Sequence, residues 1–351
     1  MLYAKNYLSP LATIYRQRRL PVPGLVKRRV GDQVAADSVV AETDEPMGYR
    51  LLNLEKMMGV RVPDVRKVLV KKLNEPIKKG EVIARSGLLI KRQCVSPVNG
   101  AIIDARGNRI LIEIAPRHIE LTAFYPGRVV ALVSNYGIEL EVTGAVIEGV
   151  WGVGAELRAK LQRASPDGET PLQTEMITPK QIGSILIGGR TLTPEVIDKA
   201  VETRVGGVIV GSIPGELRPL IEAASLPVII TEGFGDAPMH PDTFDLLCSY
   251  LDREACFNPT TLVRRENRRP EVVIPLPADG QARDARQDVR LTVGTRVRAT
   301  RAPYQGGIGN VVSLPAHSCR VESGVSVQGA QVDLGSAGRV FIPFENLEII
   351  L

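Results

Sequence analysis

Three short apolar segments in the middle of the chain are each followed by residues that can hold an anion or move a proton. These residues are Gly188, Gly189, Arg190 and Thr191 after the first segment, Gly211 and Ser212 after the second, and Glu232, Gly233, Phe234, Gly235 and Asp236 after the third. Backbone N–H groups, a guanidinium and hydroxyls can bind a small anion or a nucleotide. Glu232 and Asp236 are the carboxylates that an acid and base pair would use.

The same residues also fit a purely structural role. Glycine is common where a strand turns into a helix, because it lacks a Cβ atom, and the sequence contains no G-x-G-x-x-G motif, P-loop or nucleophile elbow. The four cysteines and three histidines never stand at metal-ligand spacing. We therefore predict free thiols, no metal site and no cofactor, and both a ligand-binding crevice and simple turns remain open.

The segments that carry these residues alternate between strand and helix patterns. Residues 184–189, 206–212 and 227–233 are apolar and rich in β-branched residues, which predicts strands buried on both faces. Helical patterns begin at Thr193-Pro194 and His240-Pro241, and Pro219 delays a shorter helix between them. Residues 271–276 predict a last strand. This order predicts a small doubly wound α/β domain, flavodoxin-like or Rossmann-like, whose ligands would bind beyond the carboxyl ends of the parallel strands.

Composition and charge narrow the class of protein. The chain has 351 residues, of which 44% are apolar and 24% charged, as expected for two or three folded domains. It lacks both the roughly 18 apolar residues of a membrane span and a secretory signal pattern, so we expect a cytoplasmic protein without a membrane partner. Residues 1–127 hold 22 Lys+Arg against 12 Asp+Glu, whereas residues 128–290 hold 17 against 23. A polyanion would meet the N-terminal third first, unless these charges are simply solvated.

The N-terminal third contains an internal repeat with an offset of 43 residues. Residues 30–42 and 73–85 each predict two short strands joined by polar turns; Val34, Val39, Val40 and Ala41 align with Ile77, Val82, Ile83 and Ala84. With residues 95–103, this pattern resembles the lobes of the lipoyl and biotinyl barrel-sandwich hybrid family. Carrier members of that family acylate a hairpin lysine, but Lys91 lacks the flanking residues of their motif. The resemblance therefore implies a fold used for architecture or binding.

The C-terminal segment predicts five short strands, as in a small β-barrel. Its pattern resembles the KOW motif of the elongation factor NusG and of a large-subunit ribosomal protein, with matching residues at Gly294, Val297, Pro303, Gly306, Gly309 and Val312. The resemblance implies an SH3-like barrel, with Gly309 at the reversal between the first two strands. KOW barrels contact RNA, RNA polymerase or ribosomal proteins. The whole chain also resembles uncharacterised bacterial KOW-domain proteins.

We therefore expect three domains. They are a hybrid-like β domain at residues 1–165, the α/β domain at residues 172–277 and the KOW barrel at residues 289–351. The leading functional hypothesis is a non-enzymatic adaptor that binds the transcription or translation machinery, such as RNA polymerase or the ribosome, through RNA, DNA or an acidic protein face. Its predicted contacts are Arg28, Arg29, Lys71, Lys72, Lys78, Lys79, Arg296, Arg298, Arg301 and Tyr304. Sensing of a small anionic ligand or nucleotide in the crevice and self-assembly as a scaffold are the alternatives.

Overall fold

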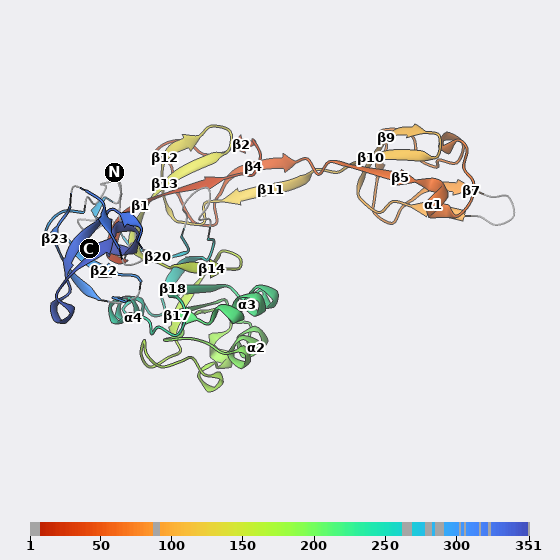
Figure 1. Cartoon of the computed structure of the whole chain (residues 1–351). Helices are drawn as coiled ribbons and strands as arrows, with labels where there is room; N and C mark the ends of the chain where they lie inside the picture. Colours follow the sequence, from red (N-terminus) through yellow and green to blue (C-terminus); the bar gives the residue numbers. More distant parts are fainter. Residues whose placement is uncertain are drawn as a thin grey trace. The chain divides into compact units, whose positions relative to one another are not determined.

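The computed structural model describes residues 8–86, 92–261, 269–277, 283–284, 291–301, 303–304, 307–315, 317–321 and 324–349. Lys91 and Gly306 lie outside the described residues. The protein has mixed α and β content, with more residues in strands than in helices, and the strands form several sheets (Figure 1). It forms two compact units, a larger one of Met1–Arg16, Phe124–Arg128 and Leu140–Leu351 and a smaller one of Gln17–Ala123 and Val129–Glu139. In the described part of the chain, every helix is too short or too polar to cross a membrane.

Four parallel strands form the centre of the larger unit. They are β15 (Leu157–Arg163), β16 (Ile185–Ile187), β17 (Gly207–Ile213) and β18 (Val228–Phe234), and each pairs with the next in chain order. The last three coincide with the predicted strands and are almost entirely buried, which explains their continuous apolar character. Short 3₁₀ turns at Thr174–Met176 and Pro179–Gln181 lie in the crossover between β15 and β16.

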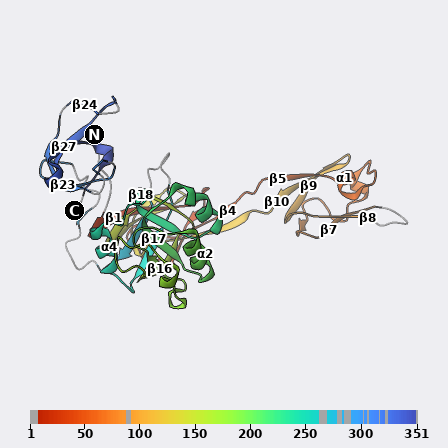
Figure 2. The ribbon, with the colours of Figure 1, turned by 60° about the horizontal axis from the view of Figure 1, so that its bottom comes forward.

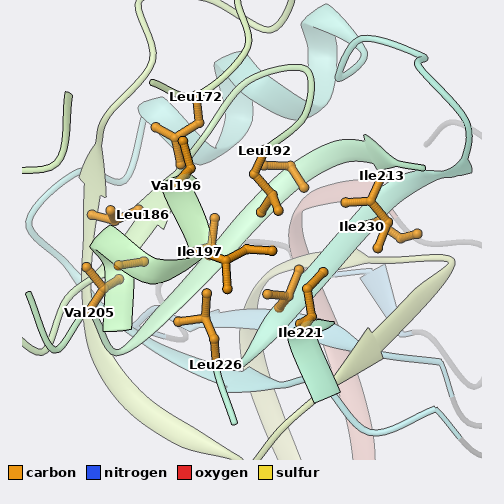
Figure 3. Close-up of a cluster of buried hydrophobic side chains, with 14 of the residues drawn as sticks. Leu172, Leu186, Leu192, Val196, Ile197, Val205, Ile213, Ile221, Leu226 and Ile230 are labelled. Carbon is orange, nitrogen blue, oxygen red and sulfur yellow. The ribbon is translucent and has the colours of Figure 1, made fainter. Parts of the chain in front are cut away.

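Helices cover both faces of these strands. The helices α2 (Pro194–Glu202) and α3 (Arg218–Ala224), the latter preceded by a 3₁₀ turn at Gly215–Leu217, pack on one face, where Ile197 and Ile221 share a core cluster with Ile230 (Figure 3). Helix α4 (Pro241–Cys248; Figure 2) packs on the other face. Phe244 and Ile209 belong to the second core cluster there. Each of β16, β17 and β18 therefore contributes side chains to both core clusters, because successive residues point to opposite faces of the sheet.

The sheet extends beyond the parallel strands. The edge strand β14 (Trp151–Val153) runs antiparallel to β18. On the other side the order continues through β19 (Glu254–Asn258), β20 (Glu271–Pro275), β13 (Gly137–Glu148), β1 (Leu8–Arg19) and β21 (Arg283–Asp284). The sheet is thus mixed rather than wholly parallel. Because β15 pairs in parallel with β16, residues 164–171 lie in a crossover within one sheet, and the domain boundary expected there is crossed by strand pairing.

The smaller unit contains the repeat in its backbone. The first copy includes β2 (Leu25–Val26), β3 (Gln33–Val34) and β4 (Val39–Glu45), and the second includes β6 (Pro76–Ile77) and β7 (Val82–Ser86). The bridge from Val26 to Ala41 recurs between Leu69 and Ala84. The side chain of Asp32 accepts the N–H of Arg29, and Glu75 accepts that of Lys72 in the same way. The offset of 43 residues therefore holds for strands, turns and turn-stabilising hydrogen bonds.

The second copy belongs to a lobe with its own core, which we call the basic lobe (residues 48–115). Its other elements are β5 (Tyr49–Asn53), α1 (Leu54–Met58), a 3₁₀ turn at Val65–Lys67, β8 (Arg92–Val95), β9 (Gly100–Arg106) and β10 (Arg109–Ile114). Ile83, Ile102 and Ile112 are fully buried in its core. Outside this lobe, the first copy pairs with β11 (Arg117–Thr122) through β4 and with β12 (Gly127–Val133) through β3.

The C-terminal segment forms a five-stranded sheet in the order β27 (Arg339–Pro343), β26 (Gly329–Asp333), β23 (Ile308–Ser313), β22 (Arg296–Ala299) and β28 (Leu347–Ile349). A two-stranded ribbon of β24 (Cys319–Arg320) and β25 (Ser326–Val327) and 3₁₀ turns at Gly335–Ala337 and Phe344–Asn346 complete it. Gly309 lies inside β23, not at a reversal. A Cβ atom there would lie 2.0 Å from the Asp333 carbonyl oxygen, so glycine permits the close approach of β26.

Candidate functional site

The predicted crevice lies at the carboxyl ends of parallel strands that are wound in one direction. Open α/β sheets form a crevice where the order of strands reverses and neighbouring crossovers leave toward opposite faces. The strands β15 to β18 follow one another without such a reversal, and α2 and α3 both pack on one face. The sequence could not show this, because the pattern of strands and helices is the same for either order.

Loops fill the space beyond these strand ends. A Cβ atom on Gly189 would lie 2.3 Å from the Thr170 carbonyl oxygen, and one on Gly211 would lie 2.4 Å from the Met239 nitrogen. A Cβ atom on Gly188 would likewise lie 2.9 Å from the side chain of Val210. These three glycines therefore allow close packing of the protein against itself, which is the structural role considered for them above.

The polar side chains of the predicted crevice mostly bind the same loops. The Arg190 guanidinium donates to the Glu169 carbonyl at 2.8 Å and lies 3.4 Å from an Asp236 carboxylate oxygen. The Ser212 hydroxyl donates to the Ala237 carbonyl at 2.8 Å. Thr191 Oγ1 is buried, and among the described residues it has no hydrogen-bond partner. One hydroxyl beside an occupied guanidinium gives little support to an anion site.

At the third strand end, the two carboxylates predicted as an acid and base pair have different partners. Glu232 lies 3.4 Å from Arg298 and accepts the His240 N–H, whereas Asp236 lies beside Arg190, so each carboxylate contacts a different guanidinium. Gly233 and Gly235 have φ values of 116° and 137°, which favour glycine. The ring of Phe234 is half exposed and packs against Trp151, with 5.4 Å between ring centroids.

The buried arginine Arg298, which contacts Glu232, also forms an ion pair within the C-terminal sheet. Its Nε and NH2 atoms lie 2.7 and 2.5 Å from one oxygen of Glu348, which faces it directly across β22 and β28. The side chains of Arg298 and Glu348 are 7% and 3% exposed. Burial raises the pKa of Glu348, and the charge of Arg298 partly opposes that shift.

These contacts correct one predicted partner residue. Arg298 is buried in an ion pair, because it alternates with the core residues Val297 and Ala299 and its own face of β22 is covered. Arg296 and Arg301 are exposed, as a binding role requires. Tyr304 is half-buried against the core of the C-terminal sheet. The C-terminal sheet thus offers two of the three predicted arginines to a partner.

Two turns of the basic lobe bring the predicted lysines together. Lys71 Nζ lies 2.9 Å from Glu75 and 2.7 Å from Glu81, so one ammonium joins both turns. The same carboxylates accept the backbone N–H groups of Lys72 and Lys78 at 3.0 and 2.9 Å. The hydrogen bonds that the Lys71 ammonium donates, first to Glu81 and then to Glu75, raise the pKa of Lys71. Lys71 is therefore a structural cation that fixes the turns.

The remaining lysines of these turns, Lys72, Lys78 and Lys79, are exposed. They belong to a larger set of exposed cations on the basic lobe, which comprises Arg50, Lys56, Arg61, Arg66, Lys67, Lys72, Lys78, Lys79, Arg85, Arg92, Arg106 and Arg109. Among the described cations of the lobe, only Lys71 and Arg106 form ion pairs. Residues 48–115 hold 14 Lys+Arg against 6 Asp+Glu, a net charge of +8. The excess charge of the N-terminal third is concentrated in this lobe.

Arg28 and Arg29 occupy the positions of Lys71 and Lys72 in the first copy of the repeat. Arg28 is half-buried, and its Nε donates to the Val39 carbonyl at 3.2 Å. Arg29 is exposed. The same division recurs in both copies, since the first cation of the pair supports the turn and the second faces solvent.

Cross-strand pairing in the first copy also assembles a set of side chains that the sequence analysis missed. Glu42, His118 and Glu120 place one ligand atom each within 4.8 Å of one another. The sequence holds one indication of this set. Glu42 and Asp44, and likewise His118 and Glu120, are two residues apart on segments with strand character, so each pair lies on one face of its strand. The notion of buried thiols fits two of the four cysteines, because Cys94 and Cys256 are buried, whereas Cys248 and Cys319 are partly exposed. No family model matches the chain, and comparisons with curated proteins and with solved structures find no similar protein.

Proposed function

We propose that the protein is a non-enzymatic cytoplasmic adaptor that binds the transcription or translation machinery, with RNA as the ligand of the basic lobe. A lobe of net charge +8 attracts a polyanion over several ångströms and releases counterions from it on binding. The observation that carries the proposal is the exposure of Lys72, Lys78 and Lys79 on two turns that Lys71 holds together.

Arrangement matters more here than the number of cations. The carboxylates of Glu75 and Glu81 accept backbone hydrogen bonds that order the two turns. Because the backbone that carries the three lysines is already ordered, less conformational entropy is lost when phosphates bind. Lys71 offsets one of the two carboxylate charges of these turns, so the three exposed lysines face only one uncompensated carboxylate charge. Phosphate contacts of this kind give affinity without base specificity.

We also propose that the repeat forms barrel-sandwich hybrid lobes and that the C-terminal sheet is an SH3-like KOW barrel. The repeat of strands and turns is what two barrel-sandwich hybrid lobes would contain, and the five-stranded C-terminal sheet is what an SH3-like KOW barrel would contain. In the families that these patterns resemble, KOW barrels contact RNA, RNA polymerase or ribosomal proteins. Exposed Arg296 and Arg301 are the residues through which the C-terminal sheet would add to such a contact.

Salt-dependent binding to single-stranded RNA tests the proposal. We expect measurable affinity of the full chain at about 50 mM salt and a linear fall of log K with log salt concentration. The variant K72Q/K78Q/K79Q removes three cations without touching Lys71. If each contacts one phosphate, the slope should fall in magnitude by about two, because each phosphate contributes about 0.7 in single strands.

The matched control is K160Q/K180Q/R253Q, which removes three exposed cations from the larger unit. This control lowers the net charge by three, as K72Q/K78Q/K79Q does. It therefore distinguishes phosphate contacts made by the basic lobe from attraction by the net charge of the whole chain. Equal losses in both triple variants would contradict a site on the basic lobe. The proposal fails if the wild-type chain shows no salt-sensitive binding to RNA or DNA and co-purifies with neither ribosomes nor RNA polymerase. RNA is also ruled out as the ligand if the chain binds an acidic protein face and shows no affinity for RNA.

A further inference from the structure

Two pairs of side chains meet on one face of the ladder between β4 and β11. The register places His118 directly opposite Asp44 and Glu120 directly opposite Glu42. Residues that face each other across antiparallel strands point to the same side of the sheet. The result is one imidazole among three carboxylates, and it does not depend on the function proposed above.

The like-charged pair in this group calls for a cation. Carboxylates that face each other directly across two strands repel, which costs stability. Lys27 offsets part of this charge, since its Nζ lies 2.5 Å from Glu42 Oε2. Glu120 has no such lysine among the described residues, and its side chain is 57% exposed.

The imidazole is held in the orientation that a metal ligand needs. His118 Nδ1 lies 2.9 Å from Asp44 Oδ1, so Nδ1 donates to this carboxylate, and in the neutral imidazole Nε2 keeps its lone pair. His118 Nε2 then lies 3.9 Å from Glu42 Oε2 and 4.0 Å from Glu120 Oε1. Histidines that bind metals usually donate their second ring N–H to a carboxylate in this way.

We propose that His118, Glu42 and Glu120 bind one divalent transition-metal ion of the zinc class, with Asp44 as the residue that orients His118. One imidazole and two carboxylates are ligands that Zn²⁺ accepts, and a water completes four-coordination at this exposed position. Zinc bonds of about 2.1 Å require ligand atoms about 3.4 Å apart, so each carboxylate must approach Nε2 by about half an ångström, and the two carboxylates, which lie within 4.8 Å of each other, must also draw together. The ion displaces the Lys27 ammonium from Glu42, because both cations use the same oxygen.

Zinc titration of the full chain tests this site. Calorimetry is run after removal of any affinity tag and at mildly alkaline pH, because a ligand imidazole must be neutral. We expect one ion per chain. H118Q and E120Q should lose this binding, and D44N should weaken it about 10- to 100-fold. K27M should tighten it, because the competing ammonium is gone.

The controls are H317Q and E216Q, which remove an exposed histidine and an exposed glutamate elsewhere in the chain. Both should bind zinc as the wild type does. Circular dichroism without metal checks that each variant is folded, and E120Q relieves a repulsion rather than creating one. Two results would overturn the proposal. One is the absence of saturable binding to the wild type, and the other is undiminished binding to folded H118Q and E120Q, which would place the ion on other groups.

Discussion

The basic lobe and the larger unit use positive charge in opposite ways. In the larger unit, Arg298 and Arg16 are paired with buried carboxylates, and the Arg16 guanidinium binds Glu271 through contacts of 2.9 and 2.5 Å. In the lobe, most described cations are exposed and free of ion pairs. Pairing and burial, rather than the number of cations, therefore separate arginines that hold the fold together from lysines that a partner can reach.

Removing Arg298 should have the largest effect on stability. R298M leaves the Glu348 carboxylate buried without the guanidinium that contacts it, which should cost about 3–5 kcal/mol. Chemical denaturation followed by circular dichroism measures this change. R296M removes the exposed arginine two residues earlier, and its effect should stay within about 0.5 kcal/mol.

A double variant separates the lost pair from lost packing. R298M/E348L replaces both partners with apolar side chains and should recover part of the stability, because the Glu348 charge is no longer buried alone, although Glu232 still loses its contact with Arg298. If R298M is as stable as R296M, the buried pair contributes nothing and the contrast with the basic lobe disappears.

Sequence alone did not separate these two arginines. Arg296, Arg298 and Arg301 form one basic cluster in the chain, and the partner that buries Arg298 lies 50 residues away in β28. Cross-strand register of this kind depends on tertiary pairing, which local patterns do not encode. The repeat was predictable, because an offset of 43 residues appears within the apolar pattern itself. The crevice was not, because strand order across a sheet leaves no local signal.

A buried carboxyl in the larger unit should give a pH-dependent effect of intermediate size. Glu148 is 13% exposed and lies 3.9 Å from Arg16. Burial, and then the charge of Glu271, raise the pKa of Glu148 from 4.5 to about 7. A pKa that is higher in the folded state stabilises the fold fully below about pH 4.5. That stability is lost as pH rises through about 7.

E148Q stays neutral at every pH and therefore removes this loss. Its free energy of unfolding should exceed that of the wild type by up to about 3 kcal/mol near pH 8 and match it near pH 4. Denaturation at the two pH values measures the difference, with E216Q as an exposed control. A pH-independent difference between E148Q and wild type would show that Glu148 does not titrate in this range.

The smallest effect on stability is expected where the two copies of the repeat differ. Lys78 and Lys79 of the second copy stand at the positions of Ala35 and Ala36 in the first. The same backbone hydrogen bond closes the turn in both copies: the Ser38 N–H donates to the Ala35 carbonyl, and the Glu81 N–H donates to the Lys78 carbonyl. K78A/K79A makes the second copy match the first there, and stability should change by no more than about 0.5 kcal/mol. RNA affinity at low salt should nevertheless fall, because two exposed cations are lost. A large loss of stability would mean that these lysines support the fold, as Arg298 does, and the division between structural and accessible cations would not hold for the basic lobe.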